Sequence, residues 1–396
     1  MTAELVLRPG RERAAARRHP WFFANGVERV RGDPAAGDTV AVRAADGRFL
    51  AWAAYSPSSS IRARAWSFEQ ADRIDEAWLA ARIAQAVARR APLAARTDAV
   101  RLVFGEADAL PGLIVDRYGA QLVTQFASAG VERWRDAIVA GLAAACGDPP
   151  VFDRSDVAAR AREGLAPRTG PLRGAAPGAV PIVEDGLRYE VDVAAGHKTG
   201  FYIDQRDSRA LVRAFAARTA GGRALNCFAY TGGFSLAALA GGAAQAVSVD
   251  SSAEALTQAA RNAALNGFGP ERARCVQADV FELLRREAAA GERYDLVVLD
   301  PPKFAASAHH VERAARAYKE INLRALGLLA PGGVLFTFSC SGAIGADLFQ
   351  KIVAGAAADA AVDCQLLHRL GAGEDHPMSM AHPEGEYLKG LCLRRV

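Results

Sequence analysis

The clearest sign of chemistry in the sequence is Cys340, which ends the apolar run GVLFTFSC (333–340) and is flanked by the small polar residues Ser339 and Ser341. A thiolate can add to carbon 6 of a pyrimidine and make carbon 5 enamine-like, so that this poorly nucleophilic carbon accepts a methyl group. A free thiol has a pKa near ~8.5, so Cys340 needs cationic or dipolar help, for which Lys303 is one candidate. We therefore expect Cys340 to be a nucleophile.

The other cysteines have an ordinary structural interpretation. A buried cysteine usually behaves as an inert small hydrophobe, and we interpret Cys227, Cys275, Cys364 and Cys392 in this way. All six cysteines lie far apart, without the paired spacing of a zinc site or the density of a secreted disulfide scaffold. We expect free thiols and no structural metal.

A second set of candidate residues follows successive apolar runs. The segment NCFAYTGGFS (226–235) ends one run and opens a helix, with Gly232-Gly233 letting the backbone approach a ligand. Asp250 closes the next run some 17 residues after Gly233. A carboxylate at this position can accept hydrogen bonds from both ribose hydroxyls of a nucleoside cofactor. Asp279 closes the third run and could receive an adenine amino group. Each Asp could instead only cap the following helix, as Ser251 or Ser252 could also do, but the ordered set favours a cofactor site.

The kind of cofactor follows from the surrounding motifs. The first turn has no G-x-G-x-x-G, and no basic residue beside Asp250 could hold a phosphate. The fourth run ends in DPPKF (300–304), whose prolines fix a rigid loop, and this tetrapeptide DPPK after strand four is a methyltransferase signature. We therefore predict S-adenosyl-L-methionine as the cofactor. The residues expected at its site are Asn226, Phe228, Tyr230, Thr231, Gly232, Asp250, Ser251, Asp279, Val280 and Asp300.

The elements that position these residues read as a doubly wound α/β domain. After residue 205, helical stretches alternate with the short apolar runs RALNCFAY, AVSVD, ARCVQAD, YDLVVLD and GVLFTFSC, and late strands are expected near 363–369 and 387–394. In such a mostly parallel sheet, ligands lie beyond the carboxyl ends of the strands. The candidate residues should therefore share one edge.

The residue patterns before this domain predict two smaller domains. Residues 39–55 alternate around Asp46-Gly47, which indicates a hairpin in a small β domain. A helix over 75–90, strands within 102–126 and a helix near 131–145 indicate a mixed domain. We expect an exposed loop over 160–180 and a hairpin at IVEDGLRYEVDV (182–193). The predicted domain boundaries are 1–72, 73–185 and 186–396.

Composition limits the class of protein. The chain has 396 residues, of which 51% are hydrophobic and 23% charged, enough for two or three globular domains. No segment reaches the roughly 18 apolar residues of a membrane span, and the N-terminus lacks a signal peptide's apolar stretch, so we expect a cytoplasmic protein. Residues 1–70 hold 11 Arg and no Lys against 7 Asp and Glu, an excess of 4 that equals the net charge of the whole chain. Such asymmetry suits binding to nucleic-acid phosphates, although it also fits an Arg-rich solvated face.

Taken together, these motifs resemble the bacterial large-subunit ribosomal RNA methyltransferase I family, which modifies carbon 5 of a cytosine in 23S ribosomal RNA. The likeness spans the chain, and its most specific stretches are His19-Pro20-Trp21, GHKTGFYIDQRDSR (196–209), NCFAYTGGFS, DPPKF, FSCSG and PEGEYLKG (383–390). The resemblance implies an N-terminal PUA domain, which is an RNA-binding β barrel, a small central α/β domain and a C-terminal class I methyltransferase domain. It also implies that Cys340 is the attacking thiol and that Phe201, Asp204, Gln205 and Arg206 help to close the pocket.

Several points stay open at this stage. The other RNA cytosine-C5 family has a second Cys after a Pro in its fourth-strand motif, where this chain has Pro302-Lys303. The group that removes the carbon-5 proton is therefore undetermined, with Asp300, Lys303 and His376 as candidates, and His376 could equally be a structural loop residue. Alternative functions are methylation of another base position such as a guanine nitrogen, a non-catalytic RNA-binding assembly factor, and a small-molecule methyltransferase. A homodimer is compatible with the sequence, which does not fix the oligomeric state.

Overall fold

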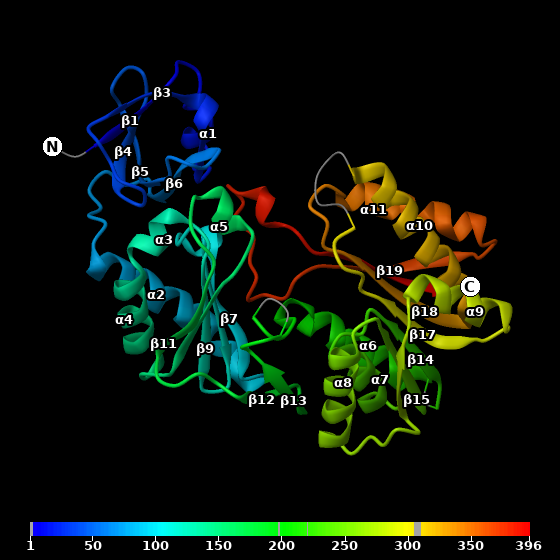
Figure 1. Cartoon of the computed structure of the whole chain (residues 1–396). Helices are drawn as coiled ribbons and strands as arrows, with labels where there is room; N and C mark the ends of the chain where they lie inside the picture. Colours follow the sequence, from blue (N-terminus) through cyan, green and yellow to red (C-terminus); the bar gives the residue numbers. More distant parts are fainter. Residues whose placement is uncertain (1–2, 197–198, 220, 305–309) are drawn as a thin grey trace. The chain divides into compact units, whose positions relative to one another are not determined.

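The structure is a computed structural model that describes residues 3–196, 199–219, 221–304 and 310–396 (Figure 1). His197 and Lys198 of the predicted GHKTGFYIDQRDSR motif lie outside these residues. The chain forms two compact units. The first comprises Met1–Val183, Val191–Ile203 and Glu374–Gly385, and the second comprises Glu184–Glu190, Asp204–Gly373 and Glu386–Val396. Segments distant in sequence therefore complete each unit.

The first unit begins with a six-stranded sheet in the order β2-β6-β5-β4-β1-β3. Its elements are β1 (Glu4–Leu7), α1 (Arg13–Ala16), β2 (Trp21–Phe23), β3 (Val27–Arg31), β4 (Thr39–Arg43), β5 (Phe49–Tyr55) and β6 (Ile61–Ser67). The predicted hairpin is confirmed, because β4 pairs antiparallel with β5 across a turn in which Gly47 has a φ of +89°. Val40 and Val42 on β4 are fully buried with Ala51 and Ala53 on β5, which forms the core of this sheet.

A second sheet of the first unit has the order β11-β10-β9-β8-β7. Its elements are α2 (Glu76–Arg90), β7 (Ala99–Phe104), β8 (Leu113–Tyr118), β9 (Gln121–Phe126), α3 (Ala129–Arg133), α4 (Arg135–Cys146), β10 (Val151–Ser155), α5 (Ala159–Arg162) and β11 (Arg168–Arg173). The predicted helix over 75–90 is confirmed: the Asp75 carboxylate accepts from the Trp78 N–H at its start, and Leu79, Ile83 and Ala86 form its buried stripe.

The exposed loop expected over residues 160–180 is wrong in part, because Arg168–Arg173 forms strand β11. This strand pairs antiparallel with β10 at the edge of the sheet, and most of its side chains are exposed. A strand that buries neither face needs no apolar alternation, and an edge position tolerates Pro171. Backbone pairing, which leaves no trace in the side-chain pattern, explains the difference.

The predicted hairpin at 182–193 is confirmed as strands β12 (Ala179–Glu184) and β13 (Leu187–Asp192). Asp185 and Gly186 between them have φ values of +48° and +81°. Two successive residues with positive φ make the type I′ turn that matches the twist of a two-residue hairpin. The Asp-Gly pair therefore specifies this turn locally.

The second unit contains a seven-stranded sheet in the order β16-β15-β14-β17-β18-β20-β19. Its strands are β14 (Arg223–Cys227), β15 (Gln245–Asp250), β16 (Ala273–Gln277), β17 (Tyr294–Leu299), β18 (Leu329–Ser339), β19 (Cys364–Leu370) and β20 (Lys389–Arg395). The first five strands in this order are parallel, whereas β20 runs antiparallel to both of its neighbours. The predicted doubly wound, mostly parallel sheet is therefore confirmed.

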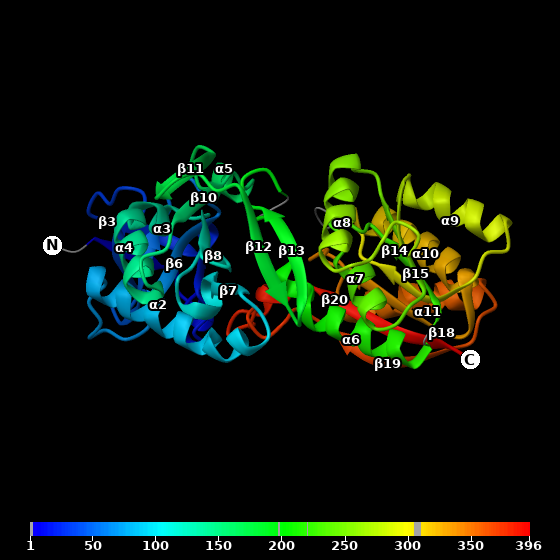
Figure 2. The ribbon, with the colours of Figure 1, turned by 90° about the horizontal axis from the view of Figure 1, so that it is seen from below.

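Helices cover both faces of this sheet (Figure 2). They are α6 (Arg206–Ala216), α7 (Gly233–Ala240), α8 (Ala253–Leu265), α9 (Val280–Ala289), α10 (Val311–Leu328) and α11 (Ala346–Asp359). Alternate strand residues enter opposite cores: Leu225 packs in the core with α9, α10 and α11, and Ala224 packs in the core with α6 and α7. Burial on both faces explains why these strands read as nearly continuous apolar runs. No helix in the described part of the chain is long and apolar enough to cross a membrane.

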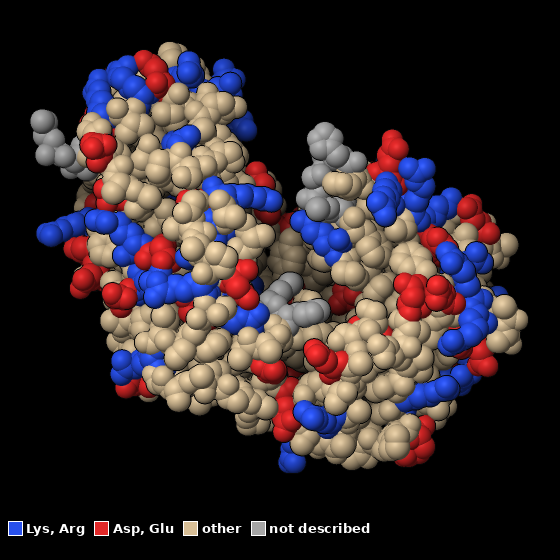
Figure 3. Space-filling model, in the orientation of Figure 1, with Lys and Arg blue, Asp and Glu red and all other residues tan. Residues whose placement is uncertain are grey.

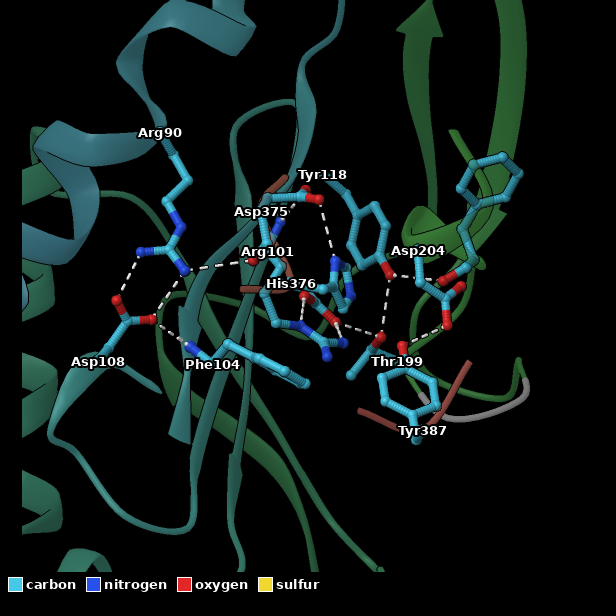
Figure 4. A network of polar contacts seen from close by, with 12 residues as sticks. Arg90, Arg101, Phe104, Asp108, Tyr118, Thr199, Asp204, Asp375, His376 and Tyr387 are labelled. Atoms are coloured by element: carbon cyan, nitrogen blue, oxygen red, sulfur yellow. Dashed lines mark hydrogen bonds and ion pairs between the residues drawn. The ribbon is translucent and has the colours of Figure 1, made fainter. Parts of the chain in front are cut away.

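A buried polar network in the first unit holds the returning segments 191–203 and 374–385 (Figure 4). Arg101 pairs with Asp116 through Nε–Oδ1 (2.6 Å) and Nη2–Oδ2 (2.8 Å), and Thr199 Oγ1 donates to Asp116 Oδ2 over 2.6 Å. The Arg101 N–H donates to Asp375 Oδ2 over 3.0 Å, and Arg90 Nη2 donates to the Asp375 carbonyl over 3.2 Å. Paired charges, which are costly to bury alone, thus attach both segments to the unit.

Candidate active site

Four parallel strands of the second unit bring most of the predicted site residues to one edge of the sheet. Cys227 at the end of β14 pairs with Val249 of β15 and with Leu299 of β17, and Leu299 pairs in turn with Thr337 of β18. At this edge lie Phe228 after β14, Asp250 at the end of β15, Asp300 after β17 and Cys340 after β18. Because the carboxyl ends of parallel strands meet at one edge, this edge is where a doubly wound sheet binds ligands.

The loop after β14 has an uncommon backbone. Phe228, Tyr230 and Gly232 all have positive φ, at +59°, +48° and +83°. Bulky residues rarely adopt this left-handed conformation, and it tends to persist at functional sites where surrounding contacts enforce it. Here the Ala229 N–H donates to the Val249 carbonyl and the Tyr230 N–H donates to Asp250 Oδ2, both over 2.9 Å. The neighbouring strand thus fixes the loop.

The two glycines of this loop make close packing contacts. A Cβ on Gly232 would lie 3.0 Å from the Cβ of Ala259 on α8, and a Cβ on Gly233 would lie 3.0 Å from the Cδ of Arg209 on α6. Gly232 also needs its positive φ. Close packing thus explains why both positions hold glycine. The expected approach of a ligand to them stays a prediction.

Asp250 ends β15 and is half-buried. Its Oδ2 accepts from the Tyr230 N–H and its Oδ1 from the Ser252 N–H, each over 2.9 Å. Two carboxylate oxygens offer about four lone-pair sites, so this anchored side chain can still accept hydrogen bonds from ribose hydroxyls. Ser252 caps α8 by accepting from the Ala255 N–H, whereas Ser251 is exposed and its carbonyl accepts from Gln277.

Asp279 is exposed and caps α9, because its Oδ1 accepts from the Glu282 N–H over 3.0 Å. The following residue, Val280, is 3% exposed and packs in the core. The cap that the sequence allowed as an alternative is therefore present. It occupies one of the carboxylate's acceptor sites and is compatible with a contact to an adenine amino group.

Two buried amides at this edge have an oxygen without a hydrogen-bond partner among the described residues. Asn226 Nδ2 donates to Ser235 Oγ over 3.0 Å, while its Oδ1 has no partner. Gln205 Nε2 donates to Asp300 Oδ2 over 3.1 Å, while its Oε1 has no partner. Unsatisfied buried acceptors are costly, so these oxygens are suited to accept from a ligand. Thr231, which is also buried, accepts at its carbonyl from Asn262.

The remaining residues of the DQR sequence (204–206) have protein partners. Tyr387 donates its hydroxyl to Asp204 Oδ2 over 2.5 Å (Figure 4). Arg206 is fully buried, and its Nε lies 3.6 Å from Glu184 Oε2. Arg209 makes two bonds of 2.6 and 2.7 Å to the same carboxylate of Glu184. This part of the predicted site is thus a buried, charge-balanced cluster.

Two other candidate residues belong to the first unit. Phe201 is buried, and its carbonyl accepts from the Tyr118 hydroxyl over 3.2 Å. His376 is also buried, with its Nδ1 3.0 Å from Asp375 Oδ1 and its ring 5.2 Å from that of Phe104. These contacts within the first unit fit a structural role for His376. The predicted cofactor role of Phe201 stays a prediction.

Cys340 is half-buried between two serines that share one partner. Ser339 Oγ donates to the Tyr318 hydroxyl over 3.0 Å, and the same hydroxyl lies 3.1 Å from Ser341 Oγ. Burial raises the pKa of Tyr318, and negative charge at Cys340 raises it further, against the bonds from the two serines. Tyr318 on α10 therefore links the side chains of the residues on both sides of the thiol.

Two lysines differ in their relation to Cys340. Lys303, the predicted cationic neighbour, is exposed. Lys389 is buried, and its Nζ donates to the carbonyls of Ser341 and Ile344 over 2.8 and 2.9 Å. Burial lowers the pKa of Lys389, while charge at Cys340 raises it. Sequence analysis had assigned no role to Lys389.

Phe304 of the DPPKF motif joins an aromatic cluster next to the strand ends. Its ring centroid lies 4.8 Å from that of Tyr318, 6.1 Å from Phe281 and 6.3 Å from Phe228. Offset aromatic pairs of this kind add about 0.5 to 1.5 kcal/mol each beyond the area that they bury. The cluster fixes the DPPKF loop against the loop after β14.

Comparison with known proteins agrees with this architecture. Residues 167–382 match the S-adenosylmethionine-dependent methyltransferase family, and residues 5–68 match the PUA-like domain. A protein of Klebsiella pneumoniae named ribosomal RNA large subunit methyltransferase I is 48% identical over 393 residues, which are 98% of each chain. A protein of the same name from Aeromonas salmonicida is 48% identical over 397 residues, covering 100% of both chains. This chain belongs to the ribosomal RNA large subunit methyltransferase I family. The resemblance expected from the motifs is confirmed.

Solved structures agree on the fold of this methyltransferase. A Streptococcus mutans protein described as a candidate SAM-dependent methyltransferase aligns with a TM-score of 0.84 and 21% identity over 100% of both chains. A candidate methyltransferase in complex with SAH aligns with a TM-score of 0.85 and the same identity and coverage. The predicted fold class, an α/β methyltransferase domain with an N-terminal PUA-like domain, is confirmed.

The donor set of this family member fits its cofactor, S-adenosylmethionine. The anchored carboxylate of Asp250 suits a ligand rich in hydroxyl and amino groups, as do the oxygens of Asn226 and Gln205 that have no partner in the described part of the chain. No cluster of His, Cys, Asp and Glu among the described residues could hold a metal ion. A hollow of about 360 Å³ in the second unit is lined by Ala260, Phe268 and Ala273 and by none of the predicted site residues.

The residues missed by sequence analysis left weak signals. Tyr387 and Lys389 lie in the PEGEYLKG stretch (383–390), which resembled the family but had no assigned chemistry. Tyr318 lies mid-helix, where an aromatic residue at helical spacing normally indicates core packing. Only the pairing of β20 with β18 and the packing of α10 bring these side chains to the strand ends.

Proposed function

We propose that this protein methylates carbon 5 of a cytosine in large-subunit (23S) ribosomal RNA, with Cys340 as the nucleophile. The observation that carries the proposal is the position of Cys340, which follows β18 on the sheet edge where Asp250 ends β15 and Asp300 follows β17. A thiol on the cofactor edge is required by carbon-5 chemistry and by no step of amine methylation.

The proposed reaction begins when the Cys340 thiolate adds to carbon 6 of the base. The S–C6 bond forms, the C5=C6 double bond opens, and carbon 5 becomes nucleophilic. S-adenosylmethionine, when bound, would supply the electrophilic methyl group: carbon 5 would bond to the methyl carbon as the methyl–sulfur bond breaks, and the sulfur would keep that electron pair in the departing S-adenosylhomocysteine. A base then takes the carbon-5 proton, the double bond re-forms, and the S–C6 bond breaks to return the thiolate. Asp300 and Lys303 are candidates for that base, and the hydrogen bond from Gln205 would orient Asp300.

Cofactor binding is proposed for the loop after β14, for the acid that ends β15 and for the acid that follows β16. The Asp250 carboxylate would accept hydrogen bonds from the ribose hydroxyls, and the Asp279 carboxylate would accept one from the adenine amino group. The buried Asn226 and Gln205 would accept from the cofactor at the oxygens that have no partner among the described residues. Phe228, Tyr230, Thr231 and Gly232 would line the site through the fixed left-handed loop.

Ribosomal RNA as substrate is supported by the names of the relatives and by the PUA-like domain. Arg8, Arg11, Arg13 and Arg17 around α1 are exposed and make no ion pair among the described residues. Figure 3 shows basic side chains gathered on the part of the first unit that carries α1 in Figure 1. Guanidinium groups without an ion-pair partner are suited to bind phosphates. A substrate of bacterial ribosomal RNA would place the protein in the cytoplasm.

The deciding experiment uses an RNA fragment with 5-fluorocytosine at the target position. With S-adenosylmethionine present, methyl transfer leaves fluorine on carbon 5 in place of the proton whose loss releases the enzyme, so the wild-type protein should stay in a covalent adduct that mass spectrometry locates at Cys340. Cys340→Ala should form no adduct and show no turnover, whereas the matched control Cys364→Ala should retain both. Methylation by Cys340→Ala at the wild-type rate would favour another base position, such as a guanine nitrogen.

A further inference from the structure

A buried lysine contacts the turn that follows the proposed nucleophile. Lys389 is the first residue of β20 and pairs in register with Ser339, which precedes Cys340. Its Nζ bonds to the carbonyl of Ser341, which follows Cys340, and to the carbonyl of Ile344 at the end of the same turn. The Ile344 N–H also donates to the Ser341 carbonyl over 3.0 Å, which closes the turn. Lys389 thus contacts the backbone on the far side of the thiol.

We propose that Lys389 is the positioning residue that stabilises the Cys340 thiolate and fixes the turn that carries it. This proposal rests on the proposed function of Cys340 and concerns how the nucleophile is prepared. No described carboxylate lies within ion-pair distance of Lys389 Nζ, so its charge is not neutralised by an acid in the described part of the chain. Two of its three N–H groups bond to carbonyls, and none of the described residues accepts the third.

The electrical environment of Cys340 favours Lys389 over Lys303 as the stabilising cation. Lys389 is only 8% exposed, whereas Lys303 is exposed, and the field of an exposed charge is strongly reduced by water. Among the described residues, Tyr318 on α10 and the exposed Glu386 before β20 also act electrostatically on Cys340 or Lys389. Burial lowers the pKa of Lys389, negative charge at Cys340 and Glu386 raises it, and Lys303 lowers it. The same coupling must favour the thiolate.

Tyr318 offers a way to separate charge from geometry. Its hydroxyl contacts the side chains of Ser339 and Ser341, so it holds the same turn as Lys389 but carries no positive charge. Tyr318→Phe should loosen the turn and leave the local charge unchanged. Lys389→Met should remove the charge together with two hydrogen bonds, and Lys389→Arg should keep the charge.

The test measures how fast iodoacetamide alkylates Cys340 at a series of pH values, with mass spectrometry of the Cys340 peptide to distinguish it from the other five cysteines. The full-length protein is used without cofactor or RNA, so the readout does not depend on methyl transfer. We expect Lys389→Met to move the midpoint of the rate profile upward by about one pH unit or more, a tenfold change in the thiolate equilibrium. Tyr318→Phe, Lys303→Met and Lys389→Arg should keep the midpoint near the wild-type value.

Each outcome has a defined meaning. An unchanged midpoint in folded Lys389→Met would overturn the proposal, as would a shift in Lys303→Met of equal size. If Lys389→Met fails to fold, as judged by circular dichroism, Lys389→Arg becomes the test, and a midpoint one unit above wild type would overturn it. Failure of the proposed function is recognised separately, by adduct formation or turnover in Cys340→Ala.

Discussion

Arg90 pairs with Asp108 through two parallel hydrogen bonds, Nη1–Oδ1 at 2.7 Å and Nη2–Oδ2 at 2.8 Å (Figure 4). Their exposed fractions are 5% and 2%. Arg90 ends α2, Asp108 lies between β7 and β8, and Arg90 also donates to the carbonyl of Asp375 in the returning segment 374–385. One buried ion pair thus joins three parts of the first unit.

We predict that Asp108→Ala destabilises the first unit by about 3 to 5 kcal/mol, because it leaves Arg90 as an uncompensated buried charge. All five Trp residues lie between Trp21 and Trp134, so tryptophan fluorescence during urea unfolding reports on the first unit alone. The control Glu69→Ala breaks an exposed pair with Arg18 in the same unit and should cost less than about 1 kcal/mol. A loss below 1 kcal/mol in Asp108→Ala would contradict the prediction.

A second prediction concerns acid and His382, which lies with its ring centroid 4.5 Å from that of Trp21. Burial lowers the pKa of His382 from its ordinary value of 6.5, and the nearby His19 lowers it further, against Glu106 and Glu384. The unfolded chain therefore binds this proton more readily than the folded one. The stabilisation is fully present above about pH 6.5 and is lost as the pH falls toward the lowered folded pKa.

Urea unfolding between pH 7.5 and 5.5 should accordingly show a falling free energy of unfolding for the first unit, and a shallower fall in His382→Asn. The pKa of Glu384 is also lowered from 4.5, so the stabilisation from that carboxylate is lost only at lower pH and does not confuse this window. The same slope in the wild-type protein and in His382→Asn would exclude His382 as the source.

A third prediction addresses the cofactor. Asp250→Ala should weaken S-adenosylmethionine binding by about 1.5 to 3 kcal/mol, because it removes charge-assisted hydrogen bonds to the ribose. Calorimetry would detect this as a roughly tenfold to hundredfold rise in Kd. Asp359→Ala is a matched control, since it removes an exposed acid that pairs with Lys319. Wild-type affinity in Asp250→Ala would remove this residue from the site.

Local turn chemistry and strand patterning made much of the fold predictable. The dipeptides Asp46-Gly47 and Asp185-Gly186 both form the expected turns. Glycine has no Cβ and so adopts the positive φ of a tight turn at little steric cost, whatever the rest of the fold is. The five parallel strands of the second unit are recognisable because both faces are buried, so their apolar runs are nearly continuous. β11 could not be found in this way, because an edge strand is stabilised by its backbone.

The candidate site was predictable only where residues end a strand or follow it directly. Asp250, Asp300 and Cys340 could be assigned to one edge because parallel topology brings strand ends together. Lys389 reaches Cys340 through the antiparallel pairing of β20 with β18, over a separation in sequence that no local pattern encodes. The cofactor and nucleophile roles, like the predicted domain boundaries and the homodimer, stay predictions.

The last prediction concerns the N-terminal arginines and rests on a comparison inside one domain. Arg8, Arg11, Arg13 and Arg17 are exposed and make no ion pair in the described part of the chain. Arg18, Arg29, Arg31 and Arg43 pair instead with Glu69, Glu28 or Glu4. Replacing either set of four by Ala changes the net charge equally, but only the first set is free to bind phosphates without breaking an ion pair. Each single-stranded phosphate contact contributes about 0.7 to the slope of log affinity against log salt, so losing the first set should reduce that slope by up to about 3. Filter binding of a ribosomal RNA fragment at several salt concentrations measures it, and the second set should change the slope much less. Equal changes in both variants would mean that general charge, and not this surface, attracts the RNA.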